Sequence, residues 1–98
     1  GLDVVFVGRC PSPVVYFALH TLPVDAGLMI TASHNSQEYN GIKIKLHTHS
    51  VWGPSIQEIK HLYVDHAAIV GAQRGSYKEE PVVDHYVDWL CTHFKHLI

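Results

Sequence analysis

The chain has 98 residues, which allows one domain at most, and its 47% hydrophobic and 16% charged residues exclude a disordered chain. The formal net charge of −2 gives no electrostatic basis for binding nucleic acid. No apolar run approaches the ~20 residues that a membrane-spanning helix needs, and no basic stretch precedes an apolar run as in a secretory signal, so we expect no membrane partner.

The first third of the chain predicts a strand, a helix and a second strand. The β-branched and aromatic run Asp3–Val7 predicts a buried strand. Ser12 is a candidate N-cap and Pro13 a candidate first helical residue for a helix over Val14–Leu22. The compact apolar run Gly27–Thr31 predicts the second strand. This order predicts a parallel βαβ unit and therefore an α/β fold.

The middle of the chain predicts a polar loop, an alternating strand and a helix. The segment Ala32–Asn40 is polar and predicts the loop. The run Ile42–Leu46 alternates between apolar and basic residues, which predicts a strand with one wet face. After a polar turn over His47–Gly53, Pro54 opens a helix whose apolar residues recur at helical spacing: Ile56, Ile59, Leu62 and Tyr63.

The last part of the chain predicts a connector and a final helix. Gly71–Glu80 is a polar connector, and Pro81 begins the helix. Its apolar stripe consists of Val82, Tyr86, Trp89, Leu90, Phe94 and Leu97. Such a face needs a cover, which could be this domain, a missing second domain or another copy of the chain. We expect it to pack on its own domain.

A group of reactive side chains follows the second predicted strand. Ser33 stands at the carboxyl end of that strand, where ligand sites gather in parallel sheets, between Thr31 and the pair His34 and Asn35. Lys43 follows ten residues after Ser33. A hydroxyl can accept a phosphoryl group, an imidazole can move protons, and an amide and an ammonium group can hold phosphate oxygens. Taken singly, these are an ordinary turn serine, a surface histidine and a solvated lysine.

The whole string has a specific resemblance. Thr31-Ala32-Ser33-His34-Asn35, followed by Tyr39-Asn40-Gly41-Ile42-Lys43, resembles the active-site serine loop of the α-D-phosphohexomutase family, which includes phosphoglucomutases and phosphomannomutases. Pro11-Ser12-Pro13 resembles an upstream family segment. The two later helices resemble the end of the family's first domain, so that the resemblance covers nearly all of the chain. It implies a partial three-layer α/β/α domain with a mixed sheet, in which a βαβ core is followed by an edge-type strand and two helices.

The resemblance implies roles for single residues. Ser33 matches the phosphoserine that passes its phosphoryl group to a hexose phosphate and regains one from the bisphosphorylated sugar. His34 and Lys43 match residues that move protons or approach the phosphate. Loop-shaping or substrate-contacting positions match Thr31, Asn35, Tyr39, Asn40 and Gly41. The implied cofactors are Mg²⁺, ligated by the phosphate on Ser33, and a hexose 1,6-bisphosphate activator, and the implied partners are hexose phosphates.

The chain also departs from the family pattern. Ser36 stands where the family usually has proline, and Ser12 where threonine is usual. The metal loop Asp-Gly-Asp-Gly-Asp-Arg and the family's sugar-binding loops do not occur. We therefore expect residues 1–80 to form part of a first domain and residues 81–98 a helix linking towards a missing second domain. The chain alone is then inactive, and its partners are the missing domains of the same protein.

Two alternatives remain open at this stage. The first is a non-catalytic truncated paralogue, with a homodimer as one of its open forms, which acts as an interaction or sugar-phosphate-binding module. The second concerns the nine histidines. His47 with His49, and His93 with His96, have spacings that suit metal pairs, although a histidine-rich surface is the simpler interpretation. Cys10 and Cys91 lie outside any CxxC pattern, which fits a reducing compartment, and we expect a cytoplasmic protein.

Overall fold

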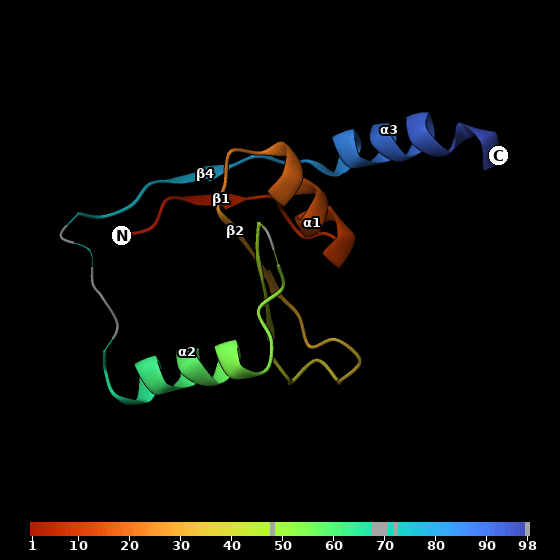
Figure 1. Ribbon diagram of the computed structural model, residues 1–98. Coiled ribbons are helices and arrows are strands. Elements are labelled where there is room, and N and C mark those ends of the chain that lie inside the picture. The colour runs from red at the N-terminus through yellow and green to blue at the C-terminus, as the bar shows by residue number, and fades with distance from the viewer. Residues whose placement is uncertain (48, 68–70, 72, 98) are drawn as a thin grey trace.

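Two short β-ladders, joined by one helix, form the framework of the computed structural model, which describes residues 1–47, 49–67, 71 and 73–97 (Figure 1). Positions 48, 72 and 98 of the expected turn, connector and linking helix lie outside the described residues. In chain order the elements are β1 (Val4–Phe6), α1 (Ser12–Thr21), β2 (Ala26–Ile30), β3 (Ile42–Leu46), α2 (Pro54–Val64), β4 (Tyr77–Glu79), α3 (Val83–Phe94) and a 3₁₀ turn (Lys95–Leu97).

The strands pair differently from the expected βαβ unit. β1 pairs in parallel with β4, with Val4 opposite Tyr77, and β2 pairs antiparallel with β3, from Ala26 opposite Leu46 to Ile30 opposite Ile42. β1 and β2 do not pair with each other, so the expected single mixed sheet is divided into two ladders. The α/β class itself is confirmed, because the structure combines helices with one parallel and one antiparallel ladder, consistent with a partial α/β/α domain.

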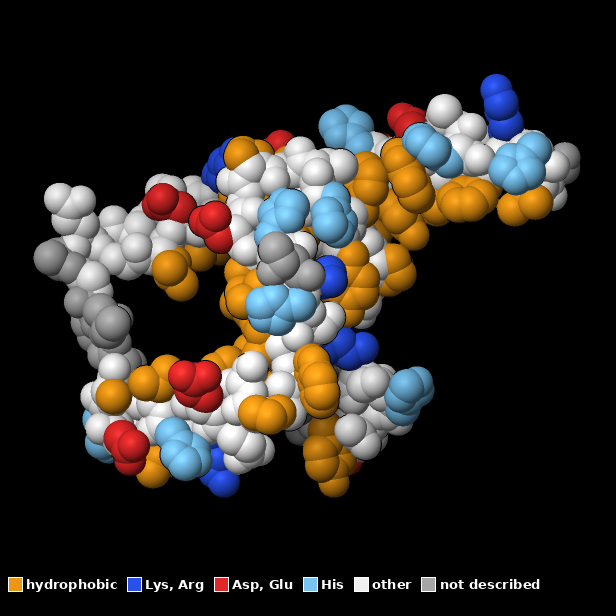
Figure 2. All heavy atoms as spheres, viewed as in Figure 1, with side chains coloured by type: hydrophobic (Ala, Val, Ile, Leu, Met, Phe, Trp, Pro, Cys, Tyr) orange, Lys and Arg blue, Asp and Glu red, His pale blue; other side chains and the backbone are white. Residues whose placement is uncertain are grey.

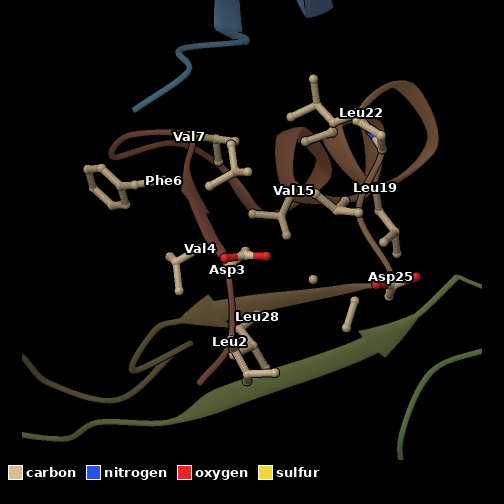
Figure 3. Close-up of a pocket in the computed structure, with 16 residues that line it drawn as sticks. Leu2, Asp3, Val4, Phe6, Val7, Val15, Leu19, Leu22, Asp25 and Leu28 are labelled. Atoms are coloured by element: carbon tan, nitrogen blue, oxygen red, sulfur yellow. The ribbon is translucent and has the colours of Figure 1, made fainter. Parts of the chain in front are cut away.

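A cavity of about 450 Å³ separates β1 from β2 beneath α1 (Figure 3). Side chains from all three elements line it, including Val4 and Val7 of the first strand region and Leu28 of β2. β1 therefore has a strand neighbour on one side only. For this reason Val4 and Phe6 are each 47% exposed, and the expectation of a buried first strand is wrong.

Helix α1 supplies most of the buried core. Its residues Val14, Val15, Ala18 and Leu19 are buried, together with Val82 just before α3. The spacing of these apolar residues explains why α1 presents one face to the core. The helix begins at Ser12, one residue before the expected first helical residue Pro13, because Pro11 rather than Ser12 is its N-cap residue.

The β2–β3 ladder packs against α1 through the face that carries its lysines. A Cβ atom on Gly27 would lie 3.2 Å from a methyl group of Val15, and Lys45 Nζ lies 5.8 Å from the centre of the Tyr16 ring. The expectation that the basic face of this strand is its wet face is therefore wrong for Lys45, which is half-buried. The opposite, apolar face is exposed instead, at Leu28, Ile30, Ile42 and Leu46.

Helix α2 forms where the sequence predicts it but stays apart from the rest (Figure 1). Among the described residues it has no substantial packing contact with another element, and its apolar residues Ile56, Ile59 and Leu62 are 43–48% exposed. The radius of gyration is 16.0 Å, whereas a compact domain of about 100 residues has ~13 Å. The helical layers expected on the two sides of the β2–β3 ladder therefore cover it only in part.

The segment Gly71–Glu80 was expected to be a connector, and this expectation is wrong for its last third. Tyr77–Glu79 form β4, and the Glu80 N–H extends the ladder by donating to the Phe6 carbonyl oxygen at 2.9 Å. The ladder begins with Asp3, whose side-chain oxygen Oδ1 accepts hydrogen bonds from the Ser76 N–H and hydroxyl, both at 2.8 Å. These contacts join the two ends of a segment of more than 70 residues.

The first half of α3 packs against α1, as expected for its apolar stripe. Tyr86 meets Phe17 edge to face at 5.4 Å between ring centres, and Trp89 lies 5.9 Å from Phe17. The helix starts at Val83 rather than at Pro81, since Val82 occupies the N-cap position. Farther along, Phe94 and Leu97 are exposed, and Figure 2 shows hydrophobic side chains along one side of this helix.

The cysteines and the hydropathy of the helices complete the description of the fold. Cys10 and Cys91 are both free thiols. Burial raises the pKa of the Cys10 thiol. In the described ranges, no helix combines the length and the hydropathy needed to cross a membrane.

Candidate functional site

The serine loop connects the two strands of the antiparallel ladder. Beyond the last strand pair, Ile30 opposite Ile42, the Thr31 N–H donates to the Gly41 carbonyl oxygen at 2.9 Å and closes the loop. A Cβ atom on Gly41 would lie 2.8 Å from the Thr31 carbonyl oxygen, so only glycine fits this close approach. Thr31 and Gly41 are half-buried, whereas the loop between them is exposed from Ser33 onward.

Ser33 has an unusual backbone conformation within this loop. Its φ is +55°, in the left-handed region that residues other than glycine rarely adopt. Its N–H donates to Thr31 Oγ1 at 3.0 Å, and its own Oγ lies 3.1 Å from Nδ1 of His34. The structure therefore brings three of the expected site residues into contact. Thr31 accepts the Ser33 N–H, and the exposed Ser33 hydroxyl lies beside the His34 imidazole.

Two of the other expected loop residues shape the chain through backbone hydrogen bonds. The Asn35 N–H donates to the Ala32 carbonyl oxygen at 3.1 Å, which closes a four-residue turn around Ser33. The Tyr39 N–H donates to the Ser36 carbonyl oxygen at 3.1 Å and closes a second turn. Asn40 is exposed and precedes Gly41, where the chain enters β3.

Lys43 lies on the strand that follows the serine loop. It is the second residue of β3, pairs across the ladder with Met29, and is exposed. Within the described part of the chain, no hydrogen bond or ion pair joins it to Ser33 or His34. The expected trio of hydroxyl, imidazole and ammonium is thus assembled as a pair, with the lysine on the strand that leaves the loop.

Sequence reasoning missed one charged group in the loop. A hydrogen bond from the Ser36 hydroxyl, followed by one from the backbone, lowers the pKa of the Glu38 carboxyl group. This contact involves the position where the phosphohexomutase family usually has proline, a residue without a hydroxyl. The spacing Ser36-x-Glu38 was its only sequence signal, since a serine hydroxyl two residues from a carboxylate can reach it.

The described side chains do not form a complete metal site. They include no cluster of three or more histidine, cysteine, aspartate or glutamate residues that could hold a metal ion. The His47 ring lies edge to face with His20 at 5.4 Å, and His93 stacks on Trp89 at 4.6 Å while its Nδ1 lies 2.9 Å from the Trp89 carbonyl oxygen.

Comparison with known families places these residues in a recognised domain. Residues 1–67 match the family model described as phosphoglucomutase/phosphomannomutase, alpha/beta/alpha domain I. The match includes α1, both strands of the β2–β3 ladder and the complete serine loop, and it continues through α2.

Two of the curated relatives match a longer part of the chain than the family model does. The chain is 33% identical to the phosphoglucomutase of Neisseria gonorrhoeae over 95 residues, which cover 97% of this chain and 21% of the relative. It is 33% identical to the phosphomannomutase of Salmonella montevideo over 97 residues, or 95% of this chain and 21% of the relative. A probable phosphoglucosamine mutase of Methanobrevibacter smithii is 54% identical over 44 residues, or 45% of this chain and 10% of the relative. The chain thus spans about a fifth or less of the length of these relatives.

Proposed function

Because this chain belongs to the phosphoglucomutase/phosphomannomutase family, we propose that it is the serine-loop part of a phosphohexomutase, an enzyme that interconverts hexose 1-phosphate and hexose 6-phosphate. In this proposal Ser33 carries the phosphoryl group between the two positions of the sugar. The observation that supports it most directly is the 3.1 Å distance between Ser33 Oγ and His34 Nδ1 in an exposed loop.

The proposed reaction consists of two phosphoryl transfers in opposite directions. In the first, a sugar hydroxyl attacks the phosphorus on Ser33, a new sugar O–P bond forms, and the bond from phosphorus to Ser33 Oγ breaks. The sugar hydroxyl loses its proton to solvent and Oγ gains one from the protonated His34 ring, so that a bisphosphorylated sugar leaves a free serine. After the sugar reorients, Ser33 Oγ attacks its other phosphoryl group, and the same bonds and protons change places in reverse.

His34 is proposed to relay the proton in both steps. With the ring proton on Nε2, Nδ1 accepts the proton of the Ser33 hydroxyl when Oγ attacks. In the opposite transfer the protonated ring returns a proton to Oγ as this oxygen leaves. The 3.1 Å separation lies within hydrogen-bonding range for such a transfer.

Positive charge must balance the phosphoserine, which carries roughly −1.5 to −2 charges at neutral pH. We propose that Lys43, the cation on the strand that leaves the loop, approaches the phosphate in the assembled enzyme. Mg²⁺, when bound, would neutralise further charge. From this chain it would use only the phosphate on Ser33, and its acidic ligands would come from outside residues 1–98.

The proposal extends to organisation and partners. Residues 1–80 would form part of the first domain, residues 81–98 would lead towards a second one, and hexose phosphates and a hexose 1,6-bisphosphate would be the ligands. The alternative of a non-catalytic module is less favoured, since the relatives that match nearly the whole chain are named as mutases.

The test compares Ser33→Ala with Ser36→Ala in the natural polypeptide that contains this chain. Both variants remove a hydroxyl from the same exposed loop, so Ser36→Ala controls for general disturbance of the loop. After incubation with a hexose 1,6-bisphosphate, intact-mass analysis should detect one added phosphoryl group in the wild-type and Ser36→Ala proteins, with peptide mapping to Ser33. Ser33→Ala should remain unmodified and lose mutase activity. Retained activity in Ser33→Ala would refute the proposal.

A further inference from the structure

Ser33 occupies a backbone position that would ordinarily favour glycine. It is the second residue of the turn closed by the Asn35 N–H and the Ala32 carbonyl oxygen, and its φ is +55°. His34, the third residue of this turn, has no positive φ. This pattern is typical of a type II′ turn, in which glycine is preferred at the second position because a side chain is strained there. A serine at this position therefore needs hydrogen bonds that hold its backbone in the left-handed conformation.

His66 is the other non-glycine residue with a positive φ among the described residues, and it shows how such a conformation is usually stabilised. His66, with a φ of +52°, follows the C-cap of α2, where the N–H of Ala67 donates to the Leu62 carbonyl oxygen at 3.0 Å. Left-handed residues are common at that position, because the terminating helix provides the hydrogen bonds. Ser33 has no helix beside it in the chain, and its support must come from the loop itself.

Thr31 provides this support through its side chain. Its Oγ1 accepts the Ser33 N–H at 3.0 Å, which fixes the orientation of the peptide unit that precedes Ser33. Thr31 is itself held in place, since its N–H donates to the Gly41 carbonyl oxygen and its carbonyl oxygen lies against Gly41 Cα. The acceptor is thus anchored to the end of the β2–β3 ladder, and only the exposed part of the loop extends beyond it.

We propose that Thr31 is a positioning residue for the phosphoryl-carrying serine: its hydroxyl holds Ser33 in the left-handed conformation in which Oγ meets His34 Nδ1. This inference rests on the proposed function of Ser33. It assigns to Thr31 a role through another residue, without contact between Thr31 and the substrate. The consequence is that the geometry of hydroxyl and imidazole exists before any sugar binds, as a catalytic site requires.

The test uses two nearly isosteric substitutions, Thr31→Val and Thr31→Ser. Valine keeps the branched shape and removes the acceptor, whereas serine keeps the hydroxyl and loses a methyl group. In the natural polypeptide that contains this chain, Thr31→Val should lower kcat about ten- to a hundredfold, with KM for the hexose phosphate nearly unchanged, because a small displacement of a reacting group has an effect of this size. Thr31→Ser should stay within about threefold of wild type, so that the serine rescues what the valine loses.

A second measurement reads the conformation without activity. In the ¹⁵N-labelled 98-residue chain, a positive φ at Ser33 gives a strong NOE between its own amide and α protons. This signal should be present in wild type and Thr31→Ser and weak in Thr31→Val. NOEs across the β2–β3 ladder, between Lys43 and Met29, report whether each variant still forms the ladder, and Gly41→Ala should weaken both sets by displacing Thr31.

The outcomes separate this inference from the proposed function. A Thr31→Val protein with wild-type kcat and a strong Ser33 NOE would overturn the positioning role, as would equal losses in Thr31→Val and Thr31→Ser. The absence of the NOE in the wild-type chain with an intact ladder would also overturn it. If Ser33→Ala keeps its activity, the proposed function fails, and the NOE comparison still decides whether Thr31 controls the backbone of Ser33.

Discussion

Asp3 and Ser76 are joined by two hydrogen bonds to one carboxylate oxygen, although 73 positions separate them in the chain. The Ser76 N–H and, next, its hydroxyl hold the pKa of the Asp3 carboxyl group below its ordinary value of 3.8. Beside this contact the Val4 N–H donates to the Ser76 carbonyl oxygen at 2.8 Å. The Asp3 carboxylate thus holds the residues that precede β1 against those that precede β4.

We expect acid to loosen this ladder at its Asp3 end. A carboxyl group whose pKa is lowered on folding stabilises the fold above its unfolded pKa, and the contribution disappears as the pH falls through the folded pKa. For Asp3 the loss should therefore occur below pH 3.8. Hydrogen exchange of the Val4 amide measures it. Asp3→Asn, which keeps an acceptor without the charge, should exchange faster at neutral pH and show no such pH step. The same step in Asp3→Asn would contradict the assignment.

A second titration is expected in the serine loop. The Ser36 hydroxyl stabilises the charged form of Glu38 and so lowers the pKa of its carboxyl group. Ser36→Ala should raise this pKa towards the ordinary range of glutamate, and Ser50→Ala, outside the loop, should leave it unchanged. A ¹³C NMR titration of the Glu38 side chain makes the comparison. An unaltered titration curve in Ser36→Ala would show that another group causes the shift.

The core at α1 should be the most sensitive part of the fold. Leu19 is 1% exposed, and Leu19→Ala should reduce the free energy of unfolding by roughly 2–5 kcal/mol, since the substitution leaves a cavity. Leu97, which is 73% exposed, serves as the matched control, and Leu97→Ala should change stability by less than about 0.5 kcal/mol. Urea unfolding of the two variants tests this difference. Similar effects at both positions would mean that α1 does not organise the core.

The aromatic contact between α1 and α3 should be measurable as a coupling energy. Phe17 and Tyr86 meet edge to face at 5.4 Å, a geometry that contributes about 0.5–1.5 kcal/mol beyond the area that it buries. A double-mutant cycle with Phe17→Leu and Tyr86→Leu should give a coupling of this size. Phe17→Leu combined with Tyr77→Leu, on β4, should give additive effects. Additivity in the first pair would show that α3 is not held by this contact.

Local pattern predicted most of the helices and strands correctly. The apolar spacing in α1, the alternation in β3 and the prolines at the starts of helices are signals within one short segment, and the structure forms these elements within a few residues of the expected bounds. β4 escaped prediction because Tyr77–Glu79 is only three residues long and owes its strand conformation to a partner far along the chain. Which strands pair, and which face of β3 meets α1, depends on such distant contacts.

The candidate site shows the same division. The string from Thr31 to Lys43 predicted the serine loop. In the structure Ser33 Oγ lies 3.1 Å from His34 Nδ1, a contact that two neighbouring residues can make. The left-handed φ of Ser33 could not be predicted, since serine itself disfavours it and the hydrogen bond from the Ser33 N–H to Thr31 Oγ1 becomes visible only in three dimensions. The position of Lys43 depends on strand register, which alternation alone does not fix.

The separation of the two ladders has a consequence for the order of folding. β2 pairs with β3, the next strand in the chain, whereas β1 pairs with β4, which comes about 70 residues later. Short loops close in well under a microsecond and hairpins in about 1–10 μs, while pairing over long sequence distances carries a larger entropic cost and slows folding. The hairpin that presents the serine is therefore the low-contact-order part of this chain, and it can nucleate before the ends of the chain meet.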